Sequence, residues 1–385
     1  MTTRLARAAP PSAALRVAVV LAGAVVLAGA GTARADPLPE LGRILAKEGA
    51  TGPATLRVDE SLSRAAGRHA EALLRDPTNA SFDALEEALM LEGLADARLL
   101  PFAGFGRAEE LFKEARLFAQ SRAHGRGMTH LGLAARTERG RAVWVVIFSR
   151  RLIELAPMPR RLEAPAHRVR GRLAAGARRP SAFVTSPDGA VQALEVKVRD
   201  SAVAVDVSFD RGAGAYTVEI LAETGLGPEV VALWRFFFKS EPRPIAGALE
   251  QAPDTSAGAH RLLARARHDR TVAPLADDPR LARAAEIHAQ AVCSALLAAH
   301  VLPGGTTPEA RARQAGYPGP IAENIAIAAS VPRAHRNLLA SPSHRRNLLD
   351  PLATRVGIGL ASAPGGVCVV QLFGYGELEA APQDR

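Results

Sequence analysis

The sequence predicts an α+β protein of 385 residues, in which two mixed helix-and-strand domains flank a β-sandwich. Near both ends of the chain, Ala, Leu and Arg recur at helical spacing and are followed by strand-like apolar runs. Six short β-rich runs separated by turn signals lie between these regions, which is typical of an immunoglobulin-like sandwich. At roughly 150 residues per domain, the length allows two or three domains.

The composition excludes several classes of protein. Hydrophobic residues make up 48% and charged residues 23%, so neither wholesale disorder nor a fibrous chain fits. Two cysteines exclude a disulfide-dense scaffold and a cysteine-rich metal site. Aromatic residues are only 4%, which argues against a stacking platform for nucleic acid, and no dense Lys/Arg stripe is present. We therefore expect no nucleic-acid partner.

Residues 1–35 have the pattern of a Sec-type signal peptide. Arginines precede an apolar run from Val17 to Ala30, and Ala33-Arg34-Ala35 forms a cleavage pattern before Asp36. The apolar run is too short to cross ~30 Å of hydrocarbon. Cleavage removes four arginines and lowers the formal net charge from +9 to +5. We expect a secreted protein, periplasmic or extracellular, whose mature chain has no transmembrane segment.

The remaining boundaries follow changes in composition. The first mixed domain spans 36–156 and ends in the strand-like run Ala142 to Phe148. The β-sandwich spans 157–245, and a linker rich in Pro, Ala and Gly covers 246–258. The second mixed domain spans 259–377, followed by a disordered tail, 378–385.

The two mixed domains are predicted to be copies of one another. Leu56–Ala70 aligns without a gap with Leu275–Ala289, with eight identities in fifteen positions. Three further matches keep the same order along the chain. They pair Ala103-Gly104-Phe105 with Ala315-Gly316-Tyr317, Ser121-Arg122-Ala123-His124 with Ser341-Pro342-Ser343-His344, and Thr129-His130-Leu131-Gly132 with Thr354-Arg355-Val356-Gly357. The offset of the last match also places Phe148 on Phe373.

The second copy has the richer set of motifs. Asp278 and Pro279 predict the N-cap and first residue of a helix whose apolar face includes His288, and His300 follows at some distance. The motifs AGY, AENIA, SPSHRRNLL, VGIG and VVQLFG come next. In order and spacing they resemble bacterial members of the CAP superfamily, the SCP-like domains of cysteine-rich secretory proteins. The resemblance covers about 259–376 and implies an α/β/α sandwich.

The resemblance also suggests a site. In many family members two histidines and two glutamates line a cleft that holds a divalent metal in some proteins. Motif matching gives His300, Glu323 and His344 as cleft and metal-ligand candidates, without a second glutamate. The tryptophan that bacterial members often carry before SPxHR is Leu338 here. Catalytic residues stay unassigned.

The residue types leave the cofactor open. Two imidazoles and one carboxylate suit zinc, yet the three candidates lie 23 and 21 residues apart, so no single helix assembles them. His344 has an alternative role. With Ser341 as N-cap and Pro342 as first helical residue, it lies in a first helical turn, where the helix dipole favours a neutral ring.

The first copy lacks part of this set. Its Glu109 and His124 correspond to Glu323 and His344, but Ser81 stands where the first histidine is expected. We therefore predict that any working cleft belongs to the C-terminal copy. His69 and His288, on the apolar faces of their helices, are interpreted as core histidines.

Cys293 and Cys368 both belong to the C-terminal copy. In an exported chain a pair in one domain predicts a disulfide, with two buried thiols or a catalytic Cys/His pair as alternatives.

Taken together, the sequence favours a secreted, non-enzymatic binding module that holds a lipid, another small apolar ligand or a cell-envelope partner in the C-terminal cleft. Two alternatives stay open. One is a metal-dependent hydrolase in which His300, Glu323 and His344 hold or flank a metal-activated water. The other is a purely structural interaction protein.

Overall fold

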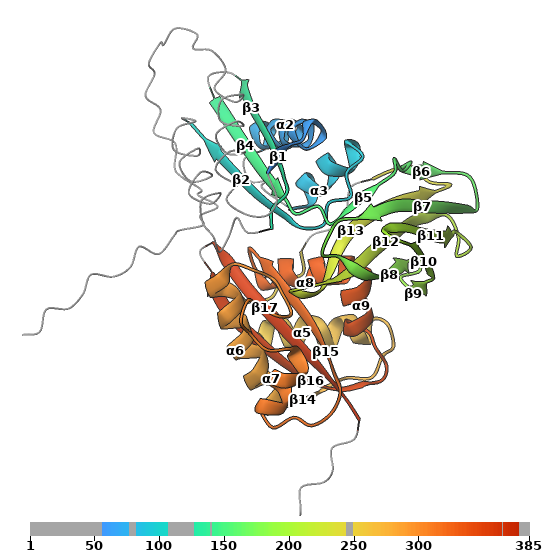
Figure 1. Ribbon diagram of the computed structural model, residues 1–385. Coiled ribbons are helices and arrows are strands. Elements are labelled where there is room, and N and C mark those ends of the chain that lie inside the picture. The colour runs from blue at the N-terminus through green and yellow to red at the C-terminus, as the bar shows by residue number, and fades with distance from the viewer. Residues whose placement is uncertain are drawn as a thin grey trace, which may run out of the picture.

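The computed structural model describes residues 56–76, 82–106, 127–138, 141–243, 249–363 and 365–376. These residues form three units in chain order, shown from blue to red in Figure 1. The predictions for the leader, the C-terminal tail, Ser81, Glu109 and His124 lie outside them. None of the helices in these ranges is long and apolar enough to cross a membrane.

The N-terminal unit is a four-stranded sheet with two described helices. Its strands are β1 (Arg57–Val58), β2 (Leu99–Phe105), β3 (His130–Glu138) and β4 (Arg141–Ser149), in the order β1-β3-β4-β2. Helices α2 (Glu60–Arg75) and α3 (Phe82–Leu91) bury their apolar sides against one face of the sheet. A smaller cluster that includes Leu131 and Phe148 lies on the other face.

The middle unit consists of two sheets with a shared apolar core. One sheet has the order β10-β11-β7-β5 and the other β6-β13-β12-β8-β9. The strands are β5 (Ile153–Leu155), β6 (Arg161–Leu162), β7 (Ala166–Leu173), β8 (Arg178–Thr185), β9 (Val191–Leu194), β10 (Val196–Arg199), β11 (Ala202–Ser208), β12 (Gly214–Thr224) and β13 (Gly227–Phe238). Alternate residues of both sheets, among them Val184, Val205 and Phe236, fill the core. All six predicted β-rich runs contain strands, but the run at 190–198 is divided into β9 and β10, which belong to different sheets. The short β5 and β6 were not predicted.

The C-terminal unit is layered as helices, sheet and helices (Figure 1). Its strands are β14 (Ala276–Asp277), β15 (Ile321–Ala328), β16 (Ala353–Ala363) and β17 (Gly366–Tyr375), in the order β14-β16-β17-β15. Its helices are α5 (Ser256–His268), α6 (Pro279–Ala295), α7 (Pro308–Gln314), α8 (Val331–Ala340) and α9 (Pro342–Leu348). Helix α6 packs with Val370 and Leu372 of β17, whereas α5 and α8 pack with Val367 and Val369, which point to the opposite face.

The two outer units share their strand order and several local contacts. In each sheet the first strand in sequence pairs in parallel with the third, and the other pairs are antiparallel. Asp59 and Asp278 each cap the following helix through a side-chain oxygen. Leu131 pairs with Phe148, and Val356 pairs with Phe373, so positions that the offset of the last sequence match relates have corresponding registers.

Glycine at two corresponding positions lets strand and helix backbones approach closely. A Cβ built on Gly132 would lie 2.4 Å from the Leu62 carbonyl carbon, and one on Gly357 would lie 2.1 Å from the Ala282 nitrogen. The second sequence match is wrong in position, because Ala103–Phe105 lies within β2 whereas Ala315–Tyr317 follows α7. The Ser121–His124 match is not described.

Most predicted element boundaries are confirmed. Helix α6 begins at Pro279 with Asp278 as N-cap, and α9 begins at Pro342. The predicted linker is shorter than expected at its C-terminal end, because α5 begins at Ser256 with the Thr255 side chain accepting from Gly258 N.

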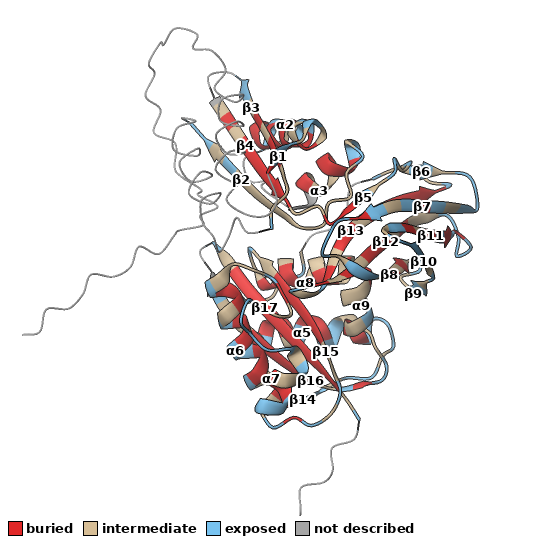
Figure 2. Ribbon diagram, in the orientation of Figure 1, coloured by how far each residue is buried: buried red, intermediate tan, exposed pale blue. Residues whose placement is uncertain are grey.

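The outer face of the β6-β13-β12-β8-β9 sheet contacts both flanking units. Three charged residues on this sheet are buried: Glu219 is 0% exposed, and Glu229 and Arg235 are each 7% exposed. Arg235 pairs with Glu86 of α3 at 2.9 Å, whereas Glu219 contacts α9. Figure 2 shows the burial of the strands beside α8 and α9. The sandwich therefore lies between the N-terminal and C-terminal units and contacts both.

Candidate functional site

His300 and Glu323 are brought together, as the sequence predicts. His300 lies in the loop between α6 and α7, and its Nδ1 is 2.8 Å from Oε1 of Glu323 on β15. The second carboxylate oxygen accepts a 2.7 Å bond from Nη2 of Arg311 on α7. Nη1 of the same guanidinium donates to the His300 carbonyl at 3.0 Å. Arg311 thus holds both the carboxylate and the loop that carries the imidazole.

Burial makes this cluster a defined site rather than a surface ion pair. The side chains of Glu323, Arg311 and His300 are 2%, 10% and 18% exposed. A buried carboxylate is stable there because both oxygens have charged or polar partners. A carboxylate oxygen can only accept, so Nδ1 of His300 carries a proton toward Glu323, and in the neutral ring Nε2 keeps a lone pair. In the described part of the chain, no hydrogen bond to this Nε2 occurs.

His344 lies in the first turn of α9, as predicted, and is half-buried. Its Nδ1 is 2.6 Å from the Ser341 hydroxyl. Its backbone carbonyl accepts from Asn324 Nδ2 at 3.1 Å, and Asn324 Oδ1 accepts from Asn347 at 2.9 Å. Because Asn324 directly follows Glu323, strand β15 positions both histidines of the site.

The imidazole of His344 is neutral at physiological pH. Burial is the main cause that lowers its pKa to about 3, and protonation of the nearby His300 lowers it further. The expected helix-dipole effect is therefore not needed to explain the neutral ring. Ser341 is the N-cap residue by position, but its side chain makes no cap hydrogen bond to α9.

Residues of the β-sandwich complete the site. Oε2 of Glu219 on β12 accepts from the Ser343 backbone N–H at 2.7 Å, and Oε1 accepts from the Ser341 hydroxyl. Burial raises the pKa of Glu219. The carboxylate therefore caps α9 in place of the Ser341 side chain. The sequence could not reveal this, because a glutamate at an alternate strand position normally faces solvent.

The β12–β13 turn lies against the loop of His300. The Leu226 carbonyl accepts from Val301 N at 3.0 Å, and a Cβ built on Gly227 would lie 3.1 Å from the His300 Cβ. Thr224, in the same turn, donates to Glu229 at 2.5 Å. The sandwich consequently contacts the site at both histidines.

The arrangement of the three candidate ligands does not fit a metal centre. Among the described residues, no three His, Cys, Asp or Glu side chains gather in a way that could hold a metal ion. Both oxygens of Glu323 are already engaged, and the adjacent Arg311 guanidinium would repel a cation. The metal assignment of His300, Glu323 and His344 thus stays a prediction from the resemblance.

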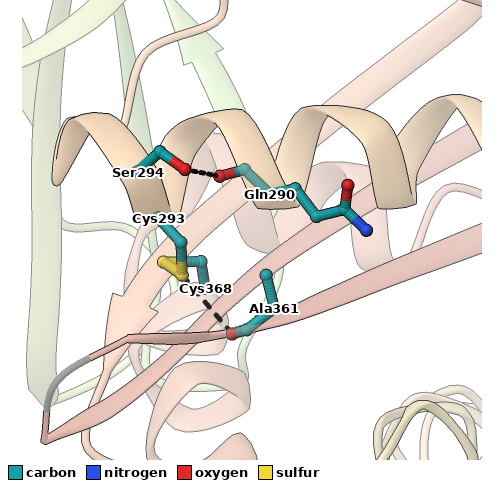
Figure 3. The surroundings of a disulfide bond; sticks show 5 residues. All are labelled: Gln290, Cys293, Ser294, Ala361 and Cys368. Carbon is teal, nitrogen blue, oxygen red and sulfur yellow. Dashed lines mark hydrogen bonds between the residues drawn. A yellow bond between two sulfur atoms is a disulfide. The ribbon is translucent and has the colours of Figure 1, made fainter. Parts of the chain in front are cut away.

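The two cysteines form the predicted disulfide. Cys293 near the end of α6 is bonded to Cys368 of β17, with a Cα–Cα distance of 5.7 Å (Figure 3). The Cys293 sulfur also lies 3.4 Å from the Ala361 carbonyl oxygen of β16. The bond links the buried side of α6 to the sheet. Because both sulfur atoms take part in it, neither cysteine is a nucleophile.

The two core histidines differ in their partners. His288 is 3% exposed, and its Nε2 lies 3.0 Å from the Ala299 carbonyl, so it is a satisfied core residue as predicted. His69 is 4% exposed, so it is a core residue as predicted, but its Nδ1 has no hydrogen-bond partner in the described residues, and the prediction of a satisfied ring is wrong for it. Burial lowers the pKa of His69 to about 4.

Comparison with known proteins agrees with the motifs. A profile of the cysteine-rich secretory protein family, CAP, matches residues 260–373. The C-terminal unit is therefore a CAP domain. No curated protein matches the sequence.

Three solved structures show similarity to parts of the chain. An outer surface protein from Borrelia burgdorferi is 23% identical with a TM-score of 0.29, over 31% of this chain and 90% of that one. An extracellular protein containing an SCP domain from Bacillus anthracis is 18% identical with a TM-score of 0.29, over 48% and 67%. A cysteine-rich secretory protein from Staphylococcus aureus is 12% identical with a TM-score of 0.26, over 75% and 89%.

Proposed function

We propose that this CAP-domain protein is an exported, non-enzymatic binding module that holds a small ligand at His300, Glu323 and His344. The observation that carries the proposal is that both rings are fixed at Nδ1, His300 by Glu323 and His344 by Ser341. Each ring is then left with Nε2 as its remaining polar atom. Two preorganised imidazoles suit recognition of a ligand at low entropic cost.

The charges of the site indicate the chemistry of the ligand. Glu323 and Arg311 compensate one another, and His344 is neutral. Two unprotonated Nε2 atoms accept hydrogen bonds. The site therefore suits an uncharged donor such as a hydroxyl or an amide N–H, carried by a lipid, another small apolar ligand or a cell-envelope partner.

The same geometry weighs against the hydrolase alternative. A serine nucleophile needs a histidine as general base, but the Ser341 hydroxyl is engaged by Glu219 and lies at Nδ1 of His344, the nitrogen that we expect to carry the proton. A metal-activated water would need a cation beside Arg311. Export is supported by the disulfide, since such bonds persist in oxidising compartments, and by the leader pattern at residues 1–35.

We further propose that the N-terminal unit is a degenerate copy of the CAP domain and that an immunoglobulin-like sandwich separates the two. The shared strand order, the Asp59 and Asp278 caps, and the close approaches at Gly132 and Gly357 support duplication. The Tyr216 hydroxyl, which donates to the Gly212 carbonyl at 2.9 Å, resembles the tyrosine corner of such sandwiches.

Native mass spectrometry tests the binding proposal. The exported chain is incubated with vesicles of phosphatidylglycerol, whose headgroup supplies uncharged hydroxyl donors, and is then separated from them. We expect one lipid-mass adduct in the native chain, at least a tenfold loss of it in His300→Ala, and no loss in His268→Ala. His268 is a matched control because its side chain is 89% exposed on α5.

The other outcomes separate the alternatives. An adduct that survives in both His300→Ala and His344→Ala would place lipid binding elsewhere and refute the proposal. Addition of zinc chloride to the metal-free chain gives a second comparison. One zinc per chain, lost in both variants, would favour the metal-dependent hydrolase, and neither lipid nor zinc would favour the structural protein.

A further inference from the structure

Glu219 is a carboxylate in an unusual environment. It lies at the middle of β12 and is fully buried, yet no basic side chain in the described residues pairs with it. Its partners are the Ser341 hydroxyl and the backbone N–H and hydroxyl of Ser343, all from the CAP domain. A buried carboxylate without a cation is costly, so its hydrogen bonds must satisfy both oxygens.

The direction of the hydrogen bonds follows from counting protons. The Ser343 N–H can only donate, so it satisfies Oε2 of Glu219. Burial raises the pKa of Glu219, so its ionised form is the one that mildly alkaline pH favours. In that form Oε1 can only accept, and its donor is the Ser341 hydroxyl. The single hydroxyl proton of Ser341 therefore points to Glu219. The Ser341 oxygen must then accept from its other neighbour, Nδ1 of His344 at 2.6 Å.

We propose that Glu219 of the β-sandwich is a positioning residue of the CAP site, which acts through Ser341 to hold the His344 proton on Nδ1 and to leave Nε2 free for a ligand. The relay crosses from one domain to another, because Glu219 and His344 are 125 positions apart in the sequence. Each site histidine thereby has its own carboxylate, Glu323 directly and Glu219 through a hydroxyl. The β-sandwich is then part of the site rather than a spacer.

The reversed network in Glu219→Gln makes the proposal testable. The amide oxygen of the new side chain must face the Ser343 N–H, since that group can only donate. Its NH2 group then faces Ser341 and donates to the hydroxyl oxygen. The Ser341 proton is released toward Nδ1 of His344, and the ring proton moves to Nε2. A nearly isosteric substitution in one domain should thus invert the tautomer of a histidine in another.

Nitrogen NMR of histidine-labelled, ligand-free protein at mildly alkaline pH reads out the tautomer directly. The ten histidines are few enough to assign, and His344→Gln identifies the signal of interest. We expect Nδ1–H for His344 in the native chain and an essentially complete change to Nε2–H in Glu219→Gln. Glu195→Gln, an exposed glutamate of the same sandwich, should leave Nδ1–H unchanged.

A second variant covers the case in which Glu219→Gln does not fold. Ser341→Ala removes the acceptor for Nδ1–H and should also give Nε2–H. Nε2–H in the native chain, or Nδ1–H retained in either variant, would overturn the proposal. The relay depends on the proposed function only in one respect, namely that Nε2 of His344 binds a ligand. Because no ligand is present in the NMR experiment, failure to find a ligand and failure of the relay are distinguishable.

Discussion

The N-terminal unit and the CAP domain share one sheet topology but differ in the residues placed around the sheet. Both have the strand order in which the first strand pairs in parallel with the third in sequence, and both begin with an aspartate-capped helix. In the CAP domain, α7 adds Arg311, α9 and its N-cap residue add His344 and Ser341, and the α6–α7 loop adds His300. No described element of the N-terminal unit corresponds to these. In the described residues, the shared sheet and its first helix therefore occur without the residues that form the site in the CAP domain.

The sandwich also contacts its two neighbouring units through different kinds of interaction. It meets the N-terminal unit through charge pairs, in which Glu229 contacts Arg98 and Arg150 while Arg235 contacts Glu86. It meets the CAP domain through hydrogen bonds to Ser341 and Ser343 and through a turn beside His300. This difference suggests that one interface mainly joins domains, whereas the other completes a site.

The largest expected difference between the units comes from removing one partner of a buried charge pair. Glu323→Ala leaves Arg311 buried without its carboxylate and should lower the stability of the CAP domain by about 3–5 kcal/mol. Glu71→Ala removes the partner of Arg136 in the N-terminal unit, where both side chains are nearly half exposed, and should cost less than about 1 kcal/mol. Hydrogen exchange followed by mass spectrometry measures each unit separately. Equal losses would contradict the assignment of a buried site to only one unit.

The disulfide gives the next largest effect, and it too is confined to the CAP domain. It closes a loop with a sequence separation of 75, which restricts the unfolded chain by up to about 4 kcal/mol. Reduction, or the double variant Cys293→Ala with Cys368→Ala, should speed exchange of α6 and β17 peptides. Peptides of α2 and β4 are the internal control and should not change.

Paired glycine substitutions test the proposed duplication. A methyl group on Gly132 or Gly357 meets backbone atoms of the neighbouring helix within 2.4 Å, so that helix must shift. Gly132→Ala and Gly357→Ala should each destabilise their own unit by about 1–3 kcal/mol. Urea unfolding monitored by hydrogen exchange gives the two values. A loss in one unit alone would mean that the close approach is not a shared feature.

The extent to which the sequence predicts this structure depends on how local each interaction is. Strand runs, the Asp278 cap and the cysteine pair were predictable, because they depend on periodicity, adjacent residues and compartment. The His300–Glu323 pair could be predicted only through the family motifs. Arg311 resembles an ordinary helical surface arginine, and Glu219 an ordinary outward-facing strand residue. Their burial depends on packing between distant elements, which one-dimensional patterns do not contain.

Acid should destabilise the CAP domain more than the N-terminal unit. Burial lowers the pKa of His335 to about 4 and is the main cause that lowers that of His344 to about 3, whereas His69 is the N-terminal residue lowered to about 4. Because these folded-state values are depressed, the unfolded chain binds protons first. The contribution of these neutral histidines to folding stability is fully present above the ordinary histidine pKa near 6.5. It is lost as the pH falls from there through their lowered pKa values in the folded protein.

His335→Leu isolates one part of this effect. His335 is buried and both its ring nitrogens lack hydrogen-bond partners in the described residues, so leucine should be tolerated at this position. Between about pH 7 and pH 5, the variant should lose about 2 kcal/mol less stability than the native chain. Thermal unfolding across this range provides the comparison. An unchanged pH dependence would contradict the role assigned to His335.

The nitrogen spectrum of the native protein tests the central claim most directly, because it compares site and core histidines in one sample. We predict Nδ1–H for His300, which faces Glu323, and for His344, which faces Ser341. We predict the opposite tautomer, Nε2–H, for His288, whose Nε2 faces the Ala299 carbonyl. Nε2–H in either site histidine would contradict a binding site built from two free Nε2 atoms.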